Sequence, residues 1–521
     1  MQTPLESFIN YKADTGMQCG SYSLEVPKLK EGEQYRFHFD ATACVGCRCC
    51  EVACNEQNNN PADIKWRRVG EMEGGTFPNT LMMLNSMSCN HCIDPACLIG
   101  CPTESYIKFD NGIVFHDDDA CIGCQYCTWN CPYGVPTYHE ERKIVTKCHM
   151  CHERIAENES PACVQACPAG AIEIEVVNTA EWLAQDIDGE GNMPHLVDAR
   201  VTNATTRYTL PDNMPEQMIA ADEHLLKPFH SEMPLVFMTV LTQISLGAFL
   251  ALLLGDGMSL FGFESPNWMM AILVMMPAAI GLPLSALHLG RPYKAMMAMK
   301  NIKTSWLSRE ALALGVFTMM MSATVGLYFF EVSTFGRIVF EILTFGVGVY
   351  GIYAQGMIYR IVARPSWDRA TTNLKFFGVA YVGILFVAFI TLVLGLNEAV
   401  LPLLILAIVA GVAQAFFTYE DYRTLLNPKA YEYQLSRTLR LYKEFFPKIQ
   451  MLRAVTLVFG VALFPIVAAL FIGSGDVALA VLMLFLALVT TFVSELCDRF
   501  LFYVTSVPLQ MAGGFFVGSQ R

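Results

Sequence analysis

Sixteen cysteines of this sequence fall into four short blocks whose spacing suits metal binding. The blocks are Cys44-x2-Cys47-x2-Cys50-x3-Cys54, Cys89-x2-Cys92-x4-Cys97-x3-Cys101, Cys121-x2-Cys124-x2-Cys127-x3-Cys131 and Cys148-x2-Cys151-x11-Cys163-x3-Cys167. The first and third have the ligand spacing of bacterial ferredoxins, in which three thiolates hold one iron–sulfur cluster and the fourth reaches a neighbouring cluster. Sixteen such ligands predict four 4Fe–4S clusters in two ferredoxin-like pairs.

Zinc and disulfides explain these blocks less well. A tetrahedral zinc site uses two C-x2-C pairs and has no place for a third cysteine two residues further on. Cysteines this close in sequence are also poor disulfide partners. Cys49 lies beside Cys50, but only Cys50 preserves the spacing of its block, and we interpret Cys19 and Cys497 as ordinary small residues.

The N-terminal part of the chain is acidic and poor in regular apolar patterns. Residues 1–226 carry 33 Asp and Glu against 15 Lys and Arg, which argues against nucleic acid as a partner. Only short strand-like runs occur, at 35–39, 112–115 and 171–177, so the metal–thiolate bonds must supply cohesion that a thin core cannot. We predict an α+β, tandem bacterial ferredoxin-like domain over 1–177, followed by an extended polar linker over 178–232.

Residues 233–521 predict an all-α, eight-helix transmembrane bundle that anchors the chain in a lipid bilayer. About twenty apolar residues suffice to cross a bilayer. Eight stretches come close to this length or exceed it, at 233–254, 268–289, 309–330, 335–358, 374–396, 399–417, 454–473 and 477–504.

The charges between these stretches predict which side faces the cytoplasm. Sixteen Lys and Arg lie between 290 and 453 in the loops on the side of the N-terminal domain, whereas Arg337 alone lies on the opposite side. Because basic residues accumulate on the cytoplasmic side, we expect the cysteine-rich domain in the cytoplasm. The N-terminal sequence has no secretory or twin-arginine signal, which agrees with this orientation.

A single histidine, His288, lies beyond His230. Bis-histidine haem needs two such ligands, so no haem is expected within this chain, and a quinone is the remaining carrier. His288 ends the second apolar stretch, where an imidazole is costly in lipid and suited to accept a proton from a quinol. The alternative is an interfacial histidine bonded to a loop carbonyl.

The four cysteine blocks resemble the electron-transfer subunit of dimethyl sulfoxide reductase-type molybdoenzymes. The resemblance covers about residues 33–175 and includes ACVGCRCCEVAC, CNHCIDPACLIGCP, CIGCQYCTWNCPYGVP and PACVQACP. It implies that the first block pairs with the fourth and the second with the third. The implied ligand sets are Cys44, Cys47, Cys50 and Cys167; Cys54, Cys148, Cys151 and Cys163; Cys89, Cys92, Cys97 and Cys131; and Cys101, Cys121, Cys124 and Cys127.

The apolar half resembles the integral anchor of the same enzymes. HLGRP after Leu287, SWLSRE at 305–310, SEMPLVFMTVLTQ at 231–243 and ELCDRFLFY at 495–503 carry this resemblance. It implies that His288 belongs to a menaquinol site. Glu232, Arg309, Glu495 and Arg499 lie at helix ends and either line the same pocket or form buried salt bridges and interfacial anchors.

Together these features predict a subunit in the prokaryotic inner membrane that moves electrons between menaquinone or ubiquinone and a molybdopterin-containing catalytic partner. One version is a cytoplasm-facing quinone-linked sulfite dehydrogenase-type complex, which the loop charges favour. The other is a quinol-oxidising terminal reductase. A redox-sensing membrane scaffold is an alternative of a different class, and it would need no quinone site.

Overall fold

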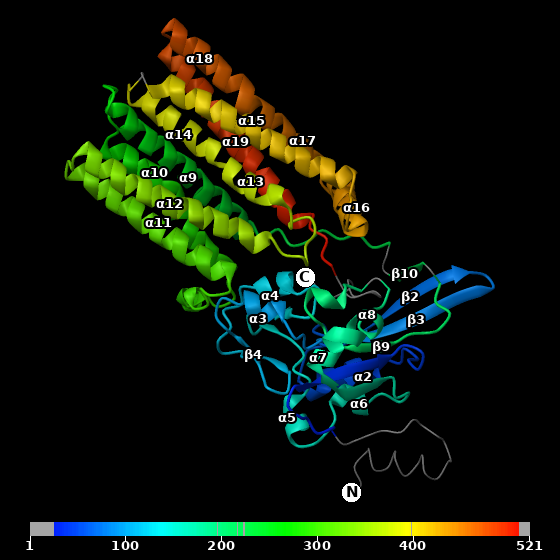
Figure 1. The fold of residues 1–521 in the computed structure, drawn as a ribbon. Coiled ribbons are helices and arrows are strands. Elements are labelled where there is room, and N and C mark those ends of the chain that lie inside the picture. Colours follow the sequence, from blue (N-terminus) through cyan, green and yellow to red (C-terminus); the bar gives the residue numbers. More distant parts are fainter. Residues whose placement is uncertain (1–25, 195, 216, 222–223, 397–398, 510–521) are drawn as a thin grey trace, which may run out of the picture. The chain divides into compact units, whose positions relative to one another are not determined.

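The computed structural model describes residues 26–509, except 195, 216, 222–223 and 397–398. These residues form two compact units (Figure 1). The first extends to Leu225, well beyond residue 177, and the second covers Leu226–Pro508, together with the short segment Ile122–Cys124.

Four small sheets build the N-terminal unit. Two of them have three strands, in the orders β8-β1-β9 and β10-β2-β3, and two are the hairpins β4-β5 and β6-β7. The strands are β1 (Glu33–Asp40), β2 (Arg68–Thr76), β3 (Asn79–Met87), β4 (Tyr106–Lys108), β5 (Val114–His116), β6 (Thr137–His139), β7 (Ile144–Thr146), β8 (Ile172–Asn178), β9 (Arg207–Thr209) and β10 (Met218–Ala220). The strand-like runs at 35–39 and 171–177 form β1 and β8, which pair antiparallel.

The segment 178–232 differs from the extended linker that its polar sequence predicts. Its strand β9 pairs in parallel with β1, and β10 pairs with β2. It also contains the short helical turns α7 (Thr179–Glu181), η1 (Trp182–Asp186), α8 (Ile187–Glu190) and η2 (Ala199–Val201). The indole of Trp182 is fully buried and donates a hydrogen bond to the carbonyl of Ala204 at 2.9 Å. Most of this segment is therefore part of the packed N-terminal unit.

Short helices follow the cysteine loops, and none of these helices exceeds nine residues. They are α2 (Cys49–Gln57), α3 (Ala96–Gly100), α4 (Tyr126–Asn130), α5 (His152–Ala156) and α6 (Ala162–Gln165). The last cysteine of each block lies within or just after such a helix. This placement carries the fourth thiol away from the other three of its own block.

The first and third blocks fold the same way. Gly46 and Gly123 occupy equivalent positions and have φ of +68° and +69°, and the residues two further on, Arg48 and Gln125, have φ of 58° and 59°. Glycine adopts this left-handed conformation without steric cost. The equal geometry shows that the two blocks are structural repeats, as their equal spacing predicts.

Eight helical segments of the membrane unit are long and apolar enough to cross a bilayer, as predicted. Three are single helices with short breaks or extensions, namely α10 (Trp268–Leu284) with η3 (Ser285–His288), α13 (Ala370–Gly378) with α14 (Ala380–Val393), and α17 (Pro447–Val458) with η7 (Phe459–Leu463) and α18 (Phe464–Ser474). The others are α9 (Met233–Ser259), α11 (Trp306–Phe329), α12 (Thr334–Tyr359), α15 (Val400–Leu426) and α19 (Val477–Val504). The connections contain η4 (Pro292–Met299), α16 (Glu432–Arg440) and η6 (Leu441–Phe445).

The helix α9 lies at the centre of this bundle and contacts α10, α12, α14 and α19. Glycines allow the backbones of α9 and α14 to approach each other closely. A Cβ at Gly247 of α9 would lie 1.8 Å from the carbonyl oxygen of Ala380, and one at Gly383 of α14 would lie 2.0 Å from that of Ile244. Small residues at helix crossings are typical of membrane bundles, where close backbone packing replaces the hydrophobic effect.

The start of the first helix of the bundle, α9, lies beside the end of the last helix, α19. The amide of Phe229, just before α9, donates to the carbonyl of Val504 at the end of α19, at 2.9 Å. This contact agrees with an even number of spans, because both ends of the bundle sequence then emerge on the same side.

Candidate metal centres and a buried polar site in the membrane unit

Three cavities in the N-terminal unit are each lined by four of the predicted cysteine ligands. The cavities have empty volumes of about 310, 250 and 370 Å³. In that order they contain Cys44, Cys47, Cys50 and Cys167; Cys54, Cys148, Cys151 and Cys163; and Cys89, Cys92, Cys97 and Cys131. Each cavity thus combines thiols from two blocks, in the sets that the resemblance implies.

The chemistry of these walls fits iron–sulfur clusters. Apart from the cysteines, apolar side chains provide much of each lining, and the cysteines of the described residues are free thiols. Backbone amides point at the sulfurs, with N to Sγ distances of 3.5 Å from His91 to Cys89, 3.4 Å from Met150 to Cys148 and 3.3 Å from Ala171 to Cys167. Such hydrogen bonds stabilise thiolate charge and tune the potential of a cluster.

Burial disfavours the charged thiolate form of some of these cysteines. Burial raises the pKa of Cys131 to about 11 and that of Cys151 to about 12. A cluster requires thiolates, so its binding releases protons from these side chains.

Two buried cations lie beside the cavities, and spacing arguments did not identify either of them. The first is Arg67, which donates from Nη2 to Ser88 Oγ at 2.9 Å and lies with its guanidinium carbon 4.6 Å from the centre of the Phe37 ring. Burial alone would lower the pKa of Arg67, but the charges of Cys163 and Cys50 outweigh burial and raise it. Because Arg67 lies outside the four blocks in sequence, only the fold could show its role.

Lys147 is the second buried cation. Its Nζ donates to the carbonyl of Cys148 at 2.7 Å and lies 3.8 Å from Cys89 Sγ, so it joins the walls of two cavities. Its position directly before the fourth block was a signal in the sequence, because a lysine next to a ligand can offset thiolate charge.

The fourth predicted set is Cys101, Cys121, Cys124 and Cys127, and all four side chains are buried. Cys101 and Cys127 pack in one small core with Tyr106 and Val145. Among the leftover cysteines, Cys49 is exposed whereas its neighbour Cys50 is buried and lines a cavity. Cys497 is half-buried, and Cys19 lies outside the described residues.

His288 ends the turn η3 and is half-buried. Its Nδ1 atom is buried and makes no hydrogen bond of regular geometry within the described residues, whereas the backbone of Ser285 interacts with the imidazole. An imidazole nitrogen in this state is available to a ligand, because an unsatisfied buried polar atom is otherwise costly.

Two of the other predicted residues lie near the ends of helices. Glu232 precedes α9 with a φ of 44°, and burial raises its pKa. Arg309 donates to the carbonyls of Ile302 at 3.0 Å and Lys303 at 2.6 Å, and stacks on Trp306. Its guanidinium therefore holds the loop before α11, which is the anchoring role that the sequence left open.

Arg499 starts a series of hydrogen bonds that crosses four helices. Its Nη2 donates to Gln243 Oε1 at 3.0 Å, Gln243 Nε2 donates to Gln355 Oε1 at 2.7 Å, and Gln355 Nε2 donates to Glu310 Oε1 at 2.9 Å. All four side chains are buried. An arginine only donates and a carboxylate only accepts, so the two ends fix the orientation of both amides.

Gln243, Gln355 and Glu310 were missed in the sequence. Each was nevertheless visible as a polar side chain within an apolar stretch, which is by default a functional candidate. Glu310 directly follows Arg309, which is one of the predicted site residues.

Glu495 belongs to a different group of side chains from Arg499. Its carboxylate accepts a hydrogen bond from Gln414 Nε2 at 3.2 Å. One turn further along α19, Asp498 pairs with Lys375 at 3.0 Å and with Arg453 at 2.7 Å. The structure thus places Glu495 and Arg499 on one helix but gives them different partners.

Comparisons with known proteins agree with both units. Residues 80–177 match the family described as 4Fe-4S dicluster domain, and residues 228–504 match the DMSO reductase anchor subunit (DmsC) family. The second match covers more than half of the chain.

Relatives of the N-terminal unit include subunits of several oxidoreductases. This sequence is 40% identical to a subunit of the anaerobic dimethyl sulfoxide reductase of Escherichia coli (strain K12), over 34% of this chain and 92% of that protein. It is 40% identical to a subunit of the sulfite dehydrogenase of Allochromatium vinosum, over 25% of this chain and 64% of that protein. It is 33% identical to the iron-sulfur subunit of the nitrate-inducible formate dehydrogenase of Escherichia coli (strain K12), over 33% of this chain and 63% of that protein.

These matches show that two parts related to separate subunits are fused here. The N-terminal unit is an iron–sulfur electron-transfer domain that binds 4Fe–4S clusters, and the C-terminal unit is a multi-pass membrane anchor. This protein belongs to the DMSO reductase anchor subunit family, with a domain homologous to a second dimethyl sulfoxide reductase subunit joined to its N-terminal side.

Proposed function

We propose that this chain carries electrons between the membrane quinone pool and a molybdopterin-containing catalytic subunit, and that it anchors this partner to the membrane. The three cavities lined by four thiols each are the main support, because each brings together cysteines that are far apart in sequence. With the fourth set of buried cysteines, they provide ligands for four 4Fe–4S clusters.

Bound clusters would supply one-electron carriers, and the protein's own side chains would fix their surroundings. The apolar walls exclude water, and the amides next to the sulfurs stabilise negative charge. Arg67 and Lys147 place positive charge against the thiolates. These groups favour the reduced state of a cluster, because reduction adds negative charge.

The quinone site in this proposal centres on His288. Quinol oxidation releases two protons, so the site needs groups that can accept them. The imidazole of His288 can accept one proton, and the carboxylate of Glu310 is a second candidate acceptor. Of the other predicted quinone residues, Glu232 lies just before α9 and its carboxylate is a further candidate proton acceptor. Arg499 is linked to Glu310 through the two glutamines. The side chains of Arg309 and Glu495 make hydrogen bonds within the protein, to loop carbonyls and to Gln414 respectively.

The orientation that we propose favours one direction of electron flow over the other. With sixteen basic residues on the side of the N-terminal domain, the clusters face the cytoplasm. Arg337, the one basic residue on the opposite side, is neutralised by Asp256 at 2.9 Å. This orientation favours a quinone-reducing complex of the sulfite dehydrogenase type over a terminal reductase of the dimethyl sulfoxide reductase type.

Iron analysis of the anaerobically purified protein tests the cluster assignment. Four clusters correspond to about sixteen iron atoms per chain. About eight would leave only one pair of clusters and would contradict the proposal. Mass spectrometry of the proteins that co-purify tests the partner, which we expect to contain molybdopterin.

A reporter fused after Arg521 tests the orientation. The proposal requires the reporter to be active in the cytoplasm. Periplasmic activity would reverse the topology and would favour the terminal reductase.

A further inference from the structure

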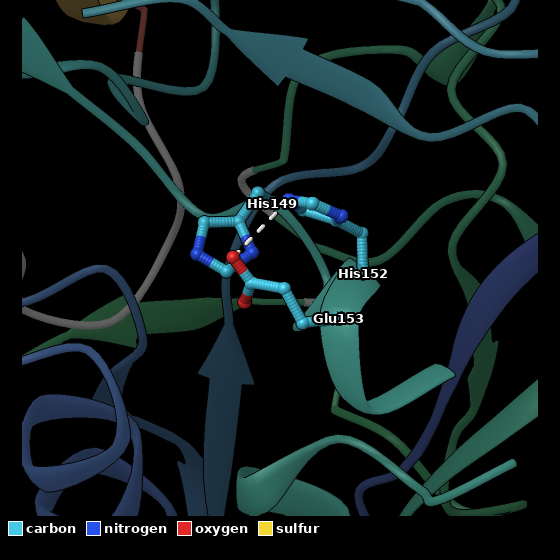
Figure 2. Close-up of side chains that lie close together, drawn as sticks. All are labelled: His149, His152 and Glu153. Carbon is cyan, nitrogen blue, oxygen red and sulfur yellow. Dashed lines mark ion pairs between the residues drawn. The ribbon is translucent and has the colours of Figure 1, made fainter. Parts of the chain in front are cut away.

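A group of three potential metal ligands lies at the start of α5, outside the four cysteine sets (Figure 2). It consists of His149, His152 and Glu153, whose ligand atoms all lie within 4.8 Å of one another. His152 Nε2 and Glu153 Oε1 are 3.5 Å apart. His149 Nδ1 is buried and has no hydrogen-bond partner in the part of the chain that the structure describes.

Aromatic rings hold the two imidazoles in place. Trp66 packs edge-on against His149 with ring centres 5.2 Å apart, and Phe115 packs edge-on against His152 at 5.0 Å. The indole of Trp66 is itself fixed, because its Nε1 donates to Thr146 Oγ1 at 3.2 Å. The imidazoles are therefore preoriented, whereas the exposed carboxylate of Glu153 can swing towards them.

Two imidazoles and one carboxylate suit a particular class of cation. First-row divalent metals such as Zn²⁺ and Co²⁺ take nitrogen ligands at about 2.0–2.1 Å, and a His₂Glu set with an open position is a known zinc arrangement. Mg²⁺ and Ca²⁺ prefer all-oxygen sites. We propose that His149, His152 and Glu153 bind a first-row divalent cation of the Zn²⁺ class, with a fourth position open to water.

The cation would lie next to a cluster, because His149 also lines the cavity formed by Cys54, Cys148, Cys151 and Cys163. This consequence rests on the proposed cluster in that cavity. A nearby dication favours the reduced form of the cluster by electrostatic attraction, so it raises the reduction potential. The coupling is reciprocal, so reduction must tighten cation binding by the same factor. A tenfold change in affinity corresponds to about 59 mV for one electron.

The relevant measurement is electron paramagnetic resonance of the intact, anaerobic protein with Zn²⁺ or Co²⁺ added. Paramagnetic Co²⁺ at this site should speed the spin relaxation of the adjacent reduced cluster, whereas diamagnetic Zn²⁺ should not. In redox titrations both cations should raise the potential of one cluster. Calorimetry should find one site per chain that binds tighter after reduction.

His152→Ala and Glu153→Gln are the test variants, and His224→Ala is the matched control. Both test variants should lose at least tenfold in Zn²⁺ affinity, together with the Co²⁺ relaxation effect and the shift in potential. His224 is an exposed histidine outside the group, so its removal should change none of these. The Glu153 side chain is exposed, so this variant keeps the test valid even if His152→Ala assembles poorly.

Iron content separates failure of this proposal from failure of the cluster assignment. If wild-type protein holds about sixteen iron atoms but binds Zn²⁺ no better than His152→Ala and Glu153→Gln, the cation site is refuted and the clusters stand. Zn²⁺ binding without an effect of Co²⁺ on any cluster would also refute it, because the cation would then lie elsewhere. Low iron in the wild type would refute the cluster assignment itself.

Discussion

The guanidinium of Arg499 and the carboxylate of Glu310 are joined through two glutamine side chains. Arg499 donates to Gln243 at 3.0 Å, and Gln355 donates to Glu310 at 2.9 Å. Because this series of hydrogen bonds has a donor at one end and an acceptor at the other, a change at Arg499 removes the constraint that aims Gln355 at the carboxylate.

Arg499→Met should therefore weaken quinone-linked turnover without any direct contact between Arg499 and the quinone. Loss of the donor leaves Gln243 Oε1 unsatisfied, which costs about 1–3 kcal/mol, and we expect turnover to fall about tenfold. Arg499→Lys should restore part of it. Steady-state assays with a soluble quinone check this, with Arg309→Met as the control, since within the described residues the hydrogen bonds of Arg309 go to loop carbonyls. Equal loss in both variants would argue against the role of the hydrogen-bond series.

Replacement of His288 should impair the reaction with quinone and leave the clusters unaffected. His288→Ala should lower quinone-linked turnover by about 10²-fold or more, the usual contribution of a general acid or base. Chemical reduction of the clusters, followed by their optical spectrum, should be unchanged. Unchanged quinone-linked turnover would instead support the redox-sensing scaffold.

Adjacent cysteines provide a sharp test of the ligand assignment. Cys50→Ser should lower iron content by about four atoms per chain or leave a cluster with an altered spectrum. Cys49→Ser should leave iron content unchanged, because Cys49 is exposed and Cys50 lines the cavity. The opposite pattern would show that spacing selected the wrong member of the pair.

The contact between α9 and α14 should tolerate no added side chain. Gly383→Leu forces a Cβ to within 2.0 Å of the carbonyl oxygen of Ile244, so the two helices must separate. Overpacking of this kind costs about 1–3 kcal/mol or more. Thermal unfolding in detergent should show the loss, whereas Gly346→Leu on α12, which meets no atom within 4 Å, should be neutral.

The features that could be predicted from the sequence are those that depend on spacing within a short segment. Cysteine spacing acts within a single loop, so it identified the sixteen candidate ligands and their repeats, and bilayer thickness fixes span length closely enough to locate eight helices. Buried contacts between distant segments have no such signature. The partners of Arg67, Lys147 and the two glutamines are defined only by the fold, and β9 and β10 are too short for a recognisable alternation.

Phe229 and Val504 meet at one end of the membrane bundle, and this has a consequence for protein engineering. A circular permutant could join these two positions by a short linker and open the polypeptide at another loop, with every helix keeping its direction. The order of the helices along the chain could thus change while their packing stays the same.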